Sequence, residues 1–456
     1  MAYDVFLVNV SRKSTQVQLP IWLSVLSNAL KLHSIEFNVV DLVPVTVENR
    51  EKFFRENIQS RPAIIGFNIM AGNDHINHVE KYAQMALDIN PEHIIIYGGS
   101  LPSSMPELLL NNCKCSYVLA GEGEKSFPAF IHSIRNGNFY PDNIPGLFFK
   151  KGNAIVGSKP GRMIVGARVN NMYQLTEFSM PDYDSIDLEF YINYLKETNQ
   201  SFEIMGSRGC KGNCSFCHKL VQGIGVKSPD IVLDEMSEII HKYDLNRFYF
   251  VDENFLELKS VYREFVRKKR ERGIDLTYRG QCRIDAIDED ICILGKDNGL
   301  AVASMGIESV NQQTLNRINK GIKISEVEEK LDMLRKYGIG FSVNFIVGFP
   351  WDTEQDYIDM INFIKKNSLE KQGKVSYLTP SPGTRLWKEC VSNGQIEDEW
   401  EFIKKLGNLF FERMINFTTL PDEVLDYYYN EIASLIQRPV TYPKSEIYIE
   451  KLSALY

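Results

Sequence analysis

The chain has 456 residues, which is too long for a single ordinary hydrophobic core. This length predicts roughly two to four domains. Its hydrophobic content of 44% and charged content of 24% are typical of a globular protein that folds in water. The net charge of −8 argues against a nucleic-acid partner held by bulk electrostatics, and no apolar run reaches the length of a membrane span.

The first 137 residues alternate short β-branched strands with helical stretches. Strands are expected at Val5–Val10, Phe37–Leu42, Ala63–Phe67, His93–Tyr97 and Ser116–Leu119. Helices are expected between them, for example over Pro20–Leu32 and Ile76–Ile89. This alternation predicts an α/β fold with a doubly wound (Rossmann-like) parallel sheet. Such sheets bind ligands at the carboxyl ends of their strands.

Glycine and small polar residues follow three of these strands. They are Gly66 and Asn68 after the third strand, Gly98, Gly99 and Ser100 after the fourth, and Glu122 after the fifth. Glycine at such a place either lets the backbone approach a ligand or makes a tight turn. The residues alone leave both interpretations open.

The remaining chain divides into three further segments. Residues 144–156 predict a hairpin with a Gly-Asn turn, and a linker follows it to about residue 200. Strand–helix alternation then returns and predicts a partial (β/α)6 TIM-type barrel, with helices at Ser228–Tyr243, Leu258–Arg272, Ser325–Tyr337 and Thr353–Asn367. A helical tail closes the chain, and we expect its aromatic residues mainly to pack against the rest. The expected domains are therefore residues 1–137, 138–200, 201–390 and 391–456.

Three cysteines, Cys210, Cys214 and Cys217, share one short loop with the spacing C-x3-C-x2-C. A closed [4Fe–4S] cluster needs four ligands, so three thiolates would leave one iron open, as in catalytic rather than structural metal sites. A zinc site or a disulfide is the alternative, but zinc sites usually pair two half-sites and the sequence has no second one. The other five of the eight cysteines show no disulfide framework, which fits a reducing cytoplasm.

This loop resembles the cluster-binding loop of the radical S-adenosylmethionine (SAM) superfamily. Further elements follow in that family's order: Asp252-Glu253-Asn254-Phe255, Arg283-x-Asp285, Gly306-x-Glu308-Ser309, Gly348-x-Pro350 and a Pro-Gly-Thr turn at Gly383. One departure is that Trp351 and Asp352 stand where the family usually has Gly-Glu. The resemblance implies that SAM chelates the open iron and that an electron from the cluster cleaves it to a 5′-deoxyadenosyl radical. It implies cluster ligation by the three cysteines and SAM contacts from Phe216, Gly306, Glu308, Ser309, Arg283 and Asn344.

The first segment is similar to the cobalamin-binding domain that precedes many radical SAM barrels, as in the class B radical SAM methyltransferases. That similarity implies a cobalamin lined by Asn9, Gly66, Asn68, Gly98, Gly99, Ser100 and Glu122. Domains that ligate cobalt through histidine carry D-x-H-x-x-G after the first strand, whereas this chain reads Asn-Val-Ser-Arg-Lys-Ser over residues 9–14. We therefore expect no histidine from this protein below the cobalt. His75 and His78 are interpreted as solvated or capping residues.

Together these resemblances imply a cytoplasmic, cobalamin-dependent radical SAM enzyme that methylates an unactivated carbon, or phosphorus, of a small molecule. A flavodoxin or ferredoxin is the expected electron donor. Three alternatives remain at this point. The enzyme could close, contract or rearrange rings without methyl transfer, or it could carry an empty first domain. In a different class, a non-catalytic protein could use the cluster only for electron transfer or iron sensing.

Overall fold

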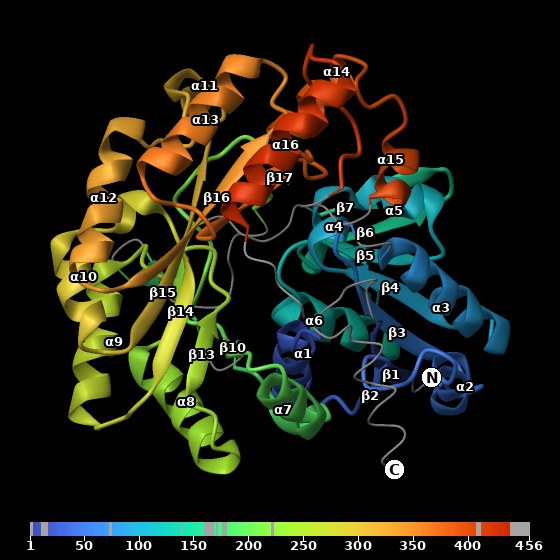
Figure 1. Cartoon of the computed structure of the whole chain (residues 1–456). Helices are drawn as coiled ribbons and strands as arrows, with labels where there is room; N and C mark the ends of the chain where they lie inside the picture. Colours follow the sequence, from blue (N-terminus) through green and yellow to red (C-terminus); the bar gives the residue numbers. More distant parts are fainter. Residues whose placement is uncertain are drawn as a thin grey trace.

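The chain folds into two α/β halves that face each other (Figure 1). The computed structural model describes residues 3–10, 17–72, 75–137, 139–158, 168–169, 172–175, 180–219, 223–406 and 412–437. In Figure 1 the N-terminal half, blue to teal, lies on the right, and the barrel half, green to orange, lies on the left. This arrangement confirms the predicted α/β fold class, with two successive sheets that are parallel except for a hairpin at one edge of the first.

The N-terminal half is built on a seven-stranded sheet with the order β2-β1-β3-β4-β5-β6-β7. Its strands are β1 (Asp4–Asn9), β2 (Asn38–Asp41), β3 (Ala63–Asn68), β4 (Ile94–Gly98), β5 (Tyr117–Leu119), β6 (Leu147–Lys151) and β7 (Ala154–Gly157). The first five strands pair in parallel, and each overlaps a predicted strand. The predicted hairpin is present as β6–β7, and it pairs antiparallel with β5. The first sheet therefore continues past residue 137.

Helices cover both faces of this sheet because successive strand residues point to opposite sides. Val5 and Leu7 of β1 pack under α1 (Ile21–Leu32) and α6 (Gly123–Arg135). Phe6 and Val8 point the other way, into the core that also holds the buried side chains of the remaining helices. Those helices are α2 (Arg50–Asn57), α3 (His75–Ile89) and α5 (Pro106–Asn112), with the short α4 (Ser100–Ser104) directly after β4.

The linker ties the two halves together. Its helix α7 (Leu188–Glu197) begins at Asp187, whose side chain accepts a hydrogen bond from the Phe190 amide. The Tyr191 hydroxyl donates to Asp41 at 2.6 Å, and Asn9 donates to the other oxygen of the same carboxylate at 2.9 Å. The short linker strands β8 (Arg168–Val169) and β9 (Met172–Gln174) join β11 (Ser207–Arg208) and β12 (Gly225–Val226) in a four-stranded sheet.

The second half is an open barrel of six parallel strands in the order β10-β13-β14-β15-β16-β17, which confirms the predicted partial (β/α)6 barrel. The strands are β10 (Phe202–Ile204), β13 (Arg247–Phe250), β14 (Thr277–Cys282), β15 (Leu300–Glu308), β16 (Gly340–Val347) and β17 (Gly373–Tyr377). The helices are α8 (Pro229–Tyr243), α9 (Lys259–Glu271), α10 (Glu289–Lys296), α11 (Gln312–Arg317), α12 (Ile324–Lys336), α13 (Glu354–Lys366) and α14 (Arg385–Ser392). The four helices expected from the sequence are all present.

The tail packs on the edge of the barrel. Helix α15 (Glu399–Lys405) precedes α16 (Asp422–Ile436), which lies against α13 and β17. Tyr429 stacks on Tyr377 with ring centres 3.9 Å apart, so aromatic packing, as expected, holds this helix. Phe410 and Phe411, which belong to the same aromatic-rich tail, lie outside the described residues.

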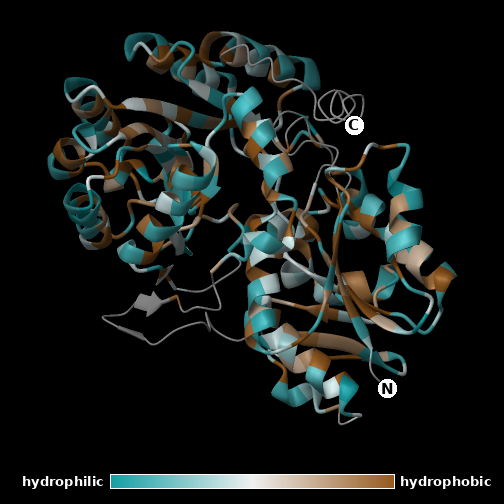
Figure 2. Ribbon diagram, turned by 90° about the horizontal axis from the view of Figure 1, so that it is seen from below, coloured by the Kyte–Doolittle hydropathy of each residue, from teal (hydrophilic) through white to brown (hydrophobic). Residues whose placement is uncertain are grey.

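Apolar residues gather on the strands, while the outward faces of the helices are largely polar (Figure 2). Within the described parts of the chain, no helix is long and apolar enough to cross a membrane.

Parallel sheets of both kinds bind ligands at the carboxyl ends of their strands, so bound cofactors are expected at those ends of the two sheets.

Candidate active site

The three clustered cysteines lie on a loop that a short hairpin closes at its base. Strand β11 enters the loop and β12 leaves it, paired antiparallel. A Cβ placed on Gly212 would lie 3.3 Å from Cys210 Sγ and 3.8 Å from Cys214 Sγ, so both sulfurs lie beside the same glycine. Cys217 is exposed as a residue, yet enough protein surrounds its sulfur that burial, followed by the neighbouring thiols of Cys214 and Cys210, raises its pKa to about 11.

The arrangement of the thiols bears on which metal group fits them. Among the described residues, no three His, Cys, Asp or Glu side chains converge as a single metal ion requires. The three thiols come from one short loop, and three thiolates of this kind fit an iron–sulfur cluster that leaves one iron open.

Two cations lie beside these thiols, where positive charge favours the thiolate form that binds metal. The Arg283 guanidinium approaches the loop, with its Nη1 3.0 Å from a Cβ placed on Gly212. It also donates to the Lys320 carbonyl at 2.7 Å and forms an ion pair with Asp285. The sequence predicted Arg283 as a SAM contact, and the structure places it next to the cluster loop.

Lys320 is the second cation, and the sequence prediction gave it no role. Its ammonium donates to Glu308 Oε1 at 2.7 Å, and both side chains are about nine-tenths buried. The only available signal was the position of Lys320 in the run that follows the fourth barrel strand, since a single lysine in a sequence is usually solvated. Through this buried pair the structure adds Lys320 to the predicted SAM residues Gly306, Glu308 and Ser309.

Glu308 is held in an unusual backbone conformation at the end of β15. Its φ is 70°, the left-handed region that a side chain other than glycine seldom adopts. The carboxylate folds back over Gly306, where an added Cβ would lie only 2.0 Å from Glu308 Oε1. Gly306 is therefore needed to leave room for the carboxylate.

We expect Gly306→Ala to weaken SAM binding about tenfold or more, the equivalent of ~1.4 kcal/mol, because the new methyl group displaces the Glu308 carboxylate from Lys320. Equilibrium dialysis of SAM against the iron-loaded protein measures the effect. Glu308→Gln is the matched control, since it keeps the side-chain shape and removes the charge. The double variant should lose little more than either single variant; fully additive losses would show that Gly306 acts by another route.

Phe216 and Asn344, the remaining predicted SAM contacts, both lie at the mouth of the barrel. Phe216 makes an edge contact with Phe349, their ring centres 6.5 Å apart, and Phe349 stacks on Trp351. Asn344 on β16 pairs in register with Gly306 on β15. The structure thus brings loop, β15 and β16 residues to one end of the barrel.

The turn after β16 carries Trp351 and Asp352 in place of the family's Gly-Glu pair. The Asp352 carboxylate accepts hydrogen bonds from the amides of Gly348 at 3.2 Å and Phe349 at 3.0 Å. Trp351 points away and donates from its indole to Thr314 at 2.9 Å. The Asp352 side chain therefore holds the turn together by accepting both backbone amides.

Burial of Asp352 raises its pKa to about 7, so its folded form binds a proton that the unfolded chain releases near pH 4. The contribution of this proton to the free energy of unfolding is complete below about pH 4. It is lost as the pH rises through about 7, and the loss amounts to up to ~4 kcal/mol. We expect Asp352→Asn to flatten the fall in unfolding midpoint between about pH 5 and pH 8 in denaturant titrations. Parallel pH profiles for both proteins would contradict this assignment.

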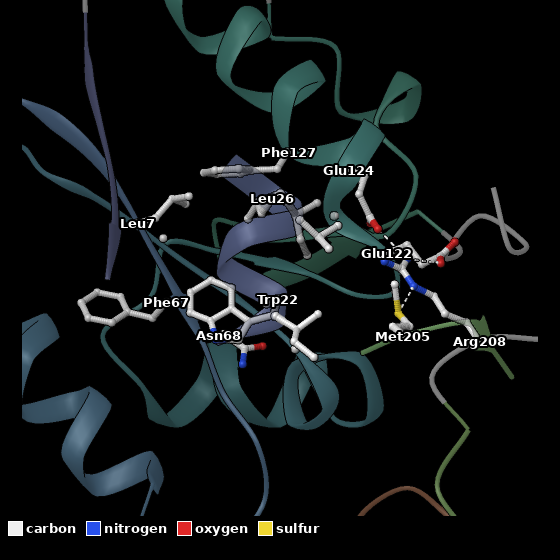
Figure 3. Close-up of a pocket in the computed structure, with 18 of the residues that line it drawn as sticks. Leu7, Trp22, Leu26, Phe67, Asn68, Glu122, Glu124, Phe127, Met205 and Arg208 are labelled. Atoms are coloured by element: carbon white, nitrogen blue, oxygen red, sulfur yellow. Dashed lines mark hydrogen bonds and ion pairs between the residues drawn. The ribbon is translucent and has the colours of Figure 1, made fainter. Parts of the chain in front are cut away.

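A cavity of about 330 Å³ opens at the carboxyl end of the N-terminal sheet. The predicted residues Gly66, Asn68, Gly98, Gly99 and Glu122 all line it. Apolar side chains of β1 and of helices α1 and α6 form its deep wall, as Figure 3 shows for Leu7, Trp22, Leu26 and Phe127. Size and lining are typical of a ligand site.

Two of the residues predicted to contact cobalamin, Asn9 and Ser100, do not line this cavity. Asn9 donates to Asp41 in the network that anchors α7, and the residues that line the cavity do not include it. Ser100 starts the short helix α4 and likewise does not line the cavity. His75, interpreted from the sequence as solvated or capping, is not solvated: it is buried, and its Nδ1 accepts a hydrogen bond from the Met70 amide at 3.1 Å.

The opposite wall of the cavity comes from the barrel half, which sequence reasoning did not foresee. Met205, Ser207 and Arg208 follow β10, and Val251 and Glu253 follow β13. At this end of the cavity the Arg208 guanidinium forms ion pairs with Glu122 and Glu124 (Figure 3). The cavity therefore lies between the two halves, next to the strand that leads into the cysteine loop.

Comparison with known proteins agrees with this geometry. Residues 204–364 match the family model of the radical SAM superfamily, and residues 9–131 match that of the B12 binding domain. The chain is a radical SAM enzyme with a B12-binding domain. The predicted membership is thereby confirmed, and both matched regions lie inside the segments predicted for them.

Relatives and solved structures are similar to most of this chain. An uncharacterized methyltransferase of Pyrococcus horikoshii is 28% identical over 73% of this chain and 70% of that protein. An anaerobic magnesium-protoporphyrin IX monomethyl ester cyclase of Rubrivivax gelatinosus is 24% identical over 83% of this chain and 67% of that protein. The radical SAM methyltransferase TsrM from Kitasatospora setae, solved with cobalamin and a [4Fe–4S] cluster, has a TM-score of 0.70 and 19% identity over 86% of this chain and 75% of that chain. At this identity the likeness to TsrM shows a shared fold.

The cofactor prediction is confirmed at the level of the family. Both family models are present, and the TsrM structures carry cobalamin, the cluster and a SAM analogue. The non-catalytic alternative is disfavoured by the same comparisons.

Proposed function

We propose that this enzyme transfers a methyl group to an unactivated carbon or phosphorus of a small molecule. The observation that carries the proposal is the cavity shared by both halves, since a cofactor held at the sheet edge would face the SAM-binding end of the barrel across it. Methyl transfer between two cofactors needs such a common space, because reacting atoms must be held close and aligned.

When bound, the cluster and SAM supply a 5′-deoxyadenosyl radical and cobalamin supplies the methyl group, while the protein orients these groups and excludes water. We assign cluster binding to Cys210, Cys214 and Cys217. SAM binding is assigned to Phe216, Gly306, Glu308, Ser309 and Asn344, with Arg283 and Lys320 as cations beside the loop. Gly66, Asn68, Gly98 and Gly99 would border the corrin.

The deep, apolar part of the cavity supports the corrinoid assignment. Cobalamin carries a flat aromatic base on its nucleotide tail, and a tail base of this kind suits a cavity wall that includes Leu7, Trp22 and Phe127. Burying aromatic surface there is favourable by about 25 cal/mol per Å². Glycines at the ends of β3 and β4 leave room above the strands for the corrin ring itself.

We further propose that a flavodoxin or ferredoxin supplies the electron. Cys217 is exposed as a residue although its sulfur is largely covered, so only a thin layer of protein would separate the bound cluster from a donor on that side of the loop. A donor could then approach from outside while the substrate occupies the internal cavity.

Ring closure without methyl transfer is the second candidate, because the relative from Rubrivivax gelatinosus is named a cyclase. The two reactions differ in how they use SAM. Methylation through cobalamin consumes one SAM as methyl donor and one as radical source, giving S-adenosylhomocysteine together with 5′-deoxyadenosine. Cyclisation gives 5′-deoxyadenosine alone.

The deciding experiment starts anaerobically from protein reconstituted with iron, sulfide and hydroxocobalamin, with iron and cobalt counted after desalting. Trideuteromethyl-SAM, reductant and a small-molecule extract of the source cells are then added, and products are followed by mass. A trideuteromethylated product with both nucleosides supports methyl transfer. A product that lacks the label contradicts it and favours cyclisation, and iron without cobalt would leave the first domain empty.

A further inference from the structure

The loop that carries the cysteines is fastened to the N-terminal half at both of its ends. Arg208 lies two residues before Cys210, and His218 follows Cys217 directly. Each side chain reaches across to a segment at the carboxyl edge of the first sheet. The family motif accounts for the three cysteines but gives no reason for these two contacts.

The first fastening is a buried ion-pair cluster. Arg208 Nη1 lies 2.7 Å from Glu122 Oε1 and also pairs with Glu124. The side chains of the two glutamates are 4% and 6% exposed, and that of Arg208 is 16% exposed. Because these charges are shielded from water, their attraction is much less screened than that of a surface pair. Both glutamates follow β5, so the guanidinium fixes that turn to β11.

The second fastening is a hydrogen bond at the other end of the loop. His218 Nε2 lies 2.5 Å from the hydroxyl of Ser104, the last residue of α4. That hydroxyl already donates to the Ser100 carbonyl at 2.8 Å, so the histidine ring is the donor of the shared hydrogen bond. A Cβ on Gly383 would lie 2.9 Å from Ser104 Cβ, so the barrel-closing loop packs against the same helix end.

These two contacts have a common geometry. Glu122 and Glu124 follow β5, and α4 follows β4, so both anchor points belong to turns that leave neighbouring strands. Gly98, Gly99 and Glu122 of the same turns line the cavity assigned to cobalamin. Each end of the cysteine loop is thus held against the sheet edge where the corrinoid would lie.

We propose that Arg208 and His218 are positioning residues that set the separation of the iron–sulfur cluster from the corrinoid. The inference rests on the proposed use of both cofactors in one reaction. Neither residue needs to touch SAM or substrate. Arg208 acts through the turn at Glu122 and Glu124, and His218 acts through α4. A misplacement of about 1 Å between reacting groups can lower a rate about a hundredfold, which gives such fastening a purpose.

The test measures the separation itself. The wild-type protein is loaded with cluster and hydroxocobalamin and partly reduced, so that cob(II)alamin and the reduced cluster each carry an unpaired electron. Pulsed electron paramagnetic resonance then gives the distribution of distances between the two spins. We expect one narrow distribution for the wild type, a broadened or shifted one for Arg208→Met, and an intermediate one for Arg208→Lys. His218→Ala should broaden the distribution as well.

Two further variants keep the test decisive. Arg267 on α9 is exposed and pairs with Glu264 and Glu271 of its own helix, so Arg267→Met removes a comparable charge network without joining the halves. We expect it to match the wild type. Glu124→Gln removes one charge at nearly constant shape and should broaden the distribution even if Arg208→Met folds poorly.

The outcomes distinguish the positioning role of Arg208 from the proposed function of the enzyme. Iron and cobalt both bound, with an unchanged narrow distribution in Arg208→Met and Glu124→Gln, would overturn the positioning role and leave the proposed function standing. A wild-type protein that takes up iron but no cobalt would overturn both.

Discussion

Cys214→Ala is expected to abolish binding of the [4Fe–4S] cluster and leave the rest of the chain folded. Two thiolates from one loop are too few to retain a cluster that the intact loop holds with three. The loop itself does not depend on this sulfur, because β11–β12 pairing closes its base and the Ser215 amide donates to the Ile318 carbonyl at 2.9 Å. Iron and sulfide counts, together with the cluster absorbance near ~400 nm, measure the loss.

Cys390→Ala provides the matched control for this prediction. Cys390 is buried on α14, outside the cysteine loop, and burial raises the pKa of its thiol to about 11, so it behaves as a small apolar side chain. It should bind iron as the wild type does. Both variants should also bind hydroxocobalamin equally, since the N-terminal cavity is untouched. If Cys214→Ala keeps its iron and its absorbance band, the ligand assignment is wrong.

Gly99→Ala is expected to weaken cobalamin binding by tenfold to a hundredfold, about 1.4–2.7 kcal/mol, without affecting the cluster. Gly99 has a φ of 103°, a conformation in which a side chain is strained. An added Cβ would lie 2.1 Å from Asn68 Oδ1 and 2.7 Å from the Ile69 carbonyl oxygen. The amide of Ile69 donates to Gly98 at 2.7 Å, so the turns after β3 and β4 would have to move together.

Gly123→Ala tests whether this effect is specific. Gly123 lines the same cavity but begins α6, and its added Cβ would meet only Leu26 Cδ1 at 3.4 Å, an ordinary contact. Spectrophotometric titration with hydroxocobalamin should give near wild-type affinity for Gly123→Ala and a clear loss for Gly99→Ala, with equal iron content in both. Equal affinities in the two variants would show that the close approach of Asn68 to Gly99 is not needed for binding.

Much of the fold could be predicted because its signals are local. The strand and helix boundaries came from hydrophobic period and from flanking residues, and β3, β4, α8 and α13 end within two residues of their predicted limits. The cysteine loop was recognisable because its ligands all lie within eight residues. The glycines after β3 and β4 were recognisable because turns demand that residue type at fixed places.

Tertiary structure alone decided the partners of the charged residues. Arg208 and Glu122 are 86 positions apart, and the chain has 51 basic and 59 acidic residues, so no pattern in the sequence selects that pair. Lys320 pairs with Glu308 12 positions earlier in the chain, and β6–β7 pairs with the edge of β5 in the first sheet. The sequence by itself indicated the cluster ligands through the spacing of three cysteines along one loop, and its resemblance to known families indicated SAM and cobalamin. Folding decided how the two cofactor sites face each other, because burial gives strength to ion pairs that are weak and unselective in the unfolded chain.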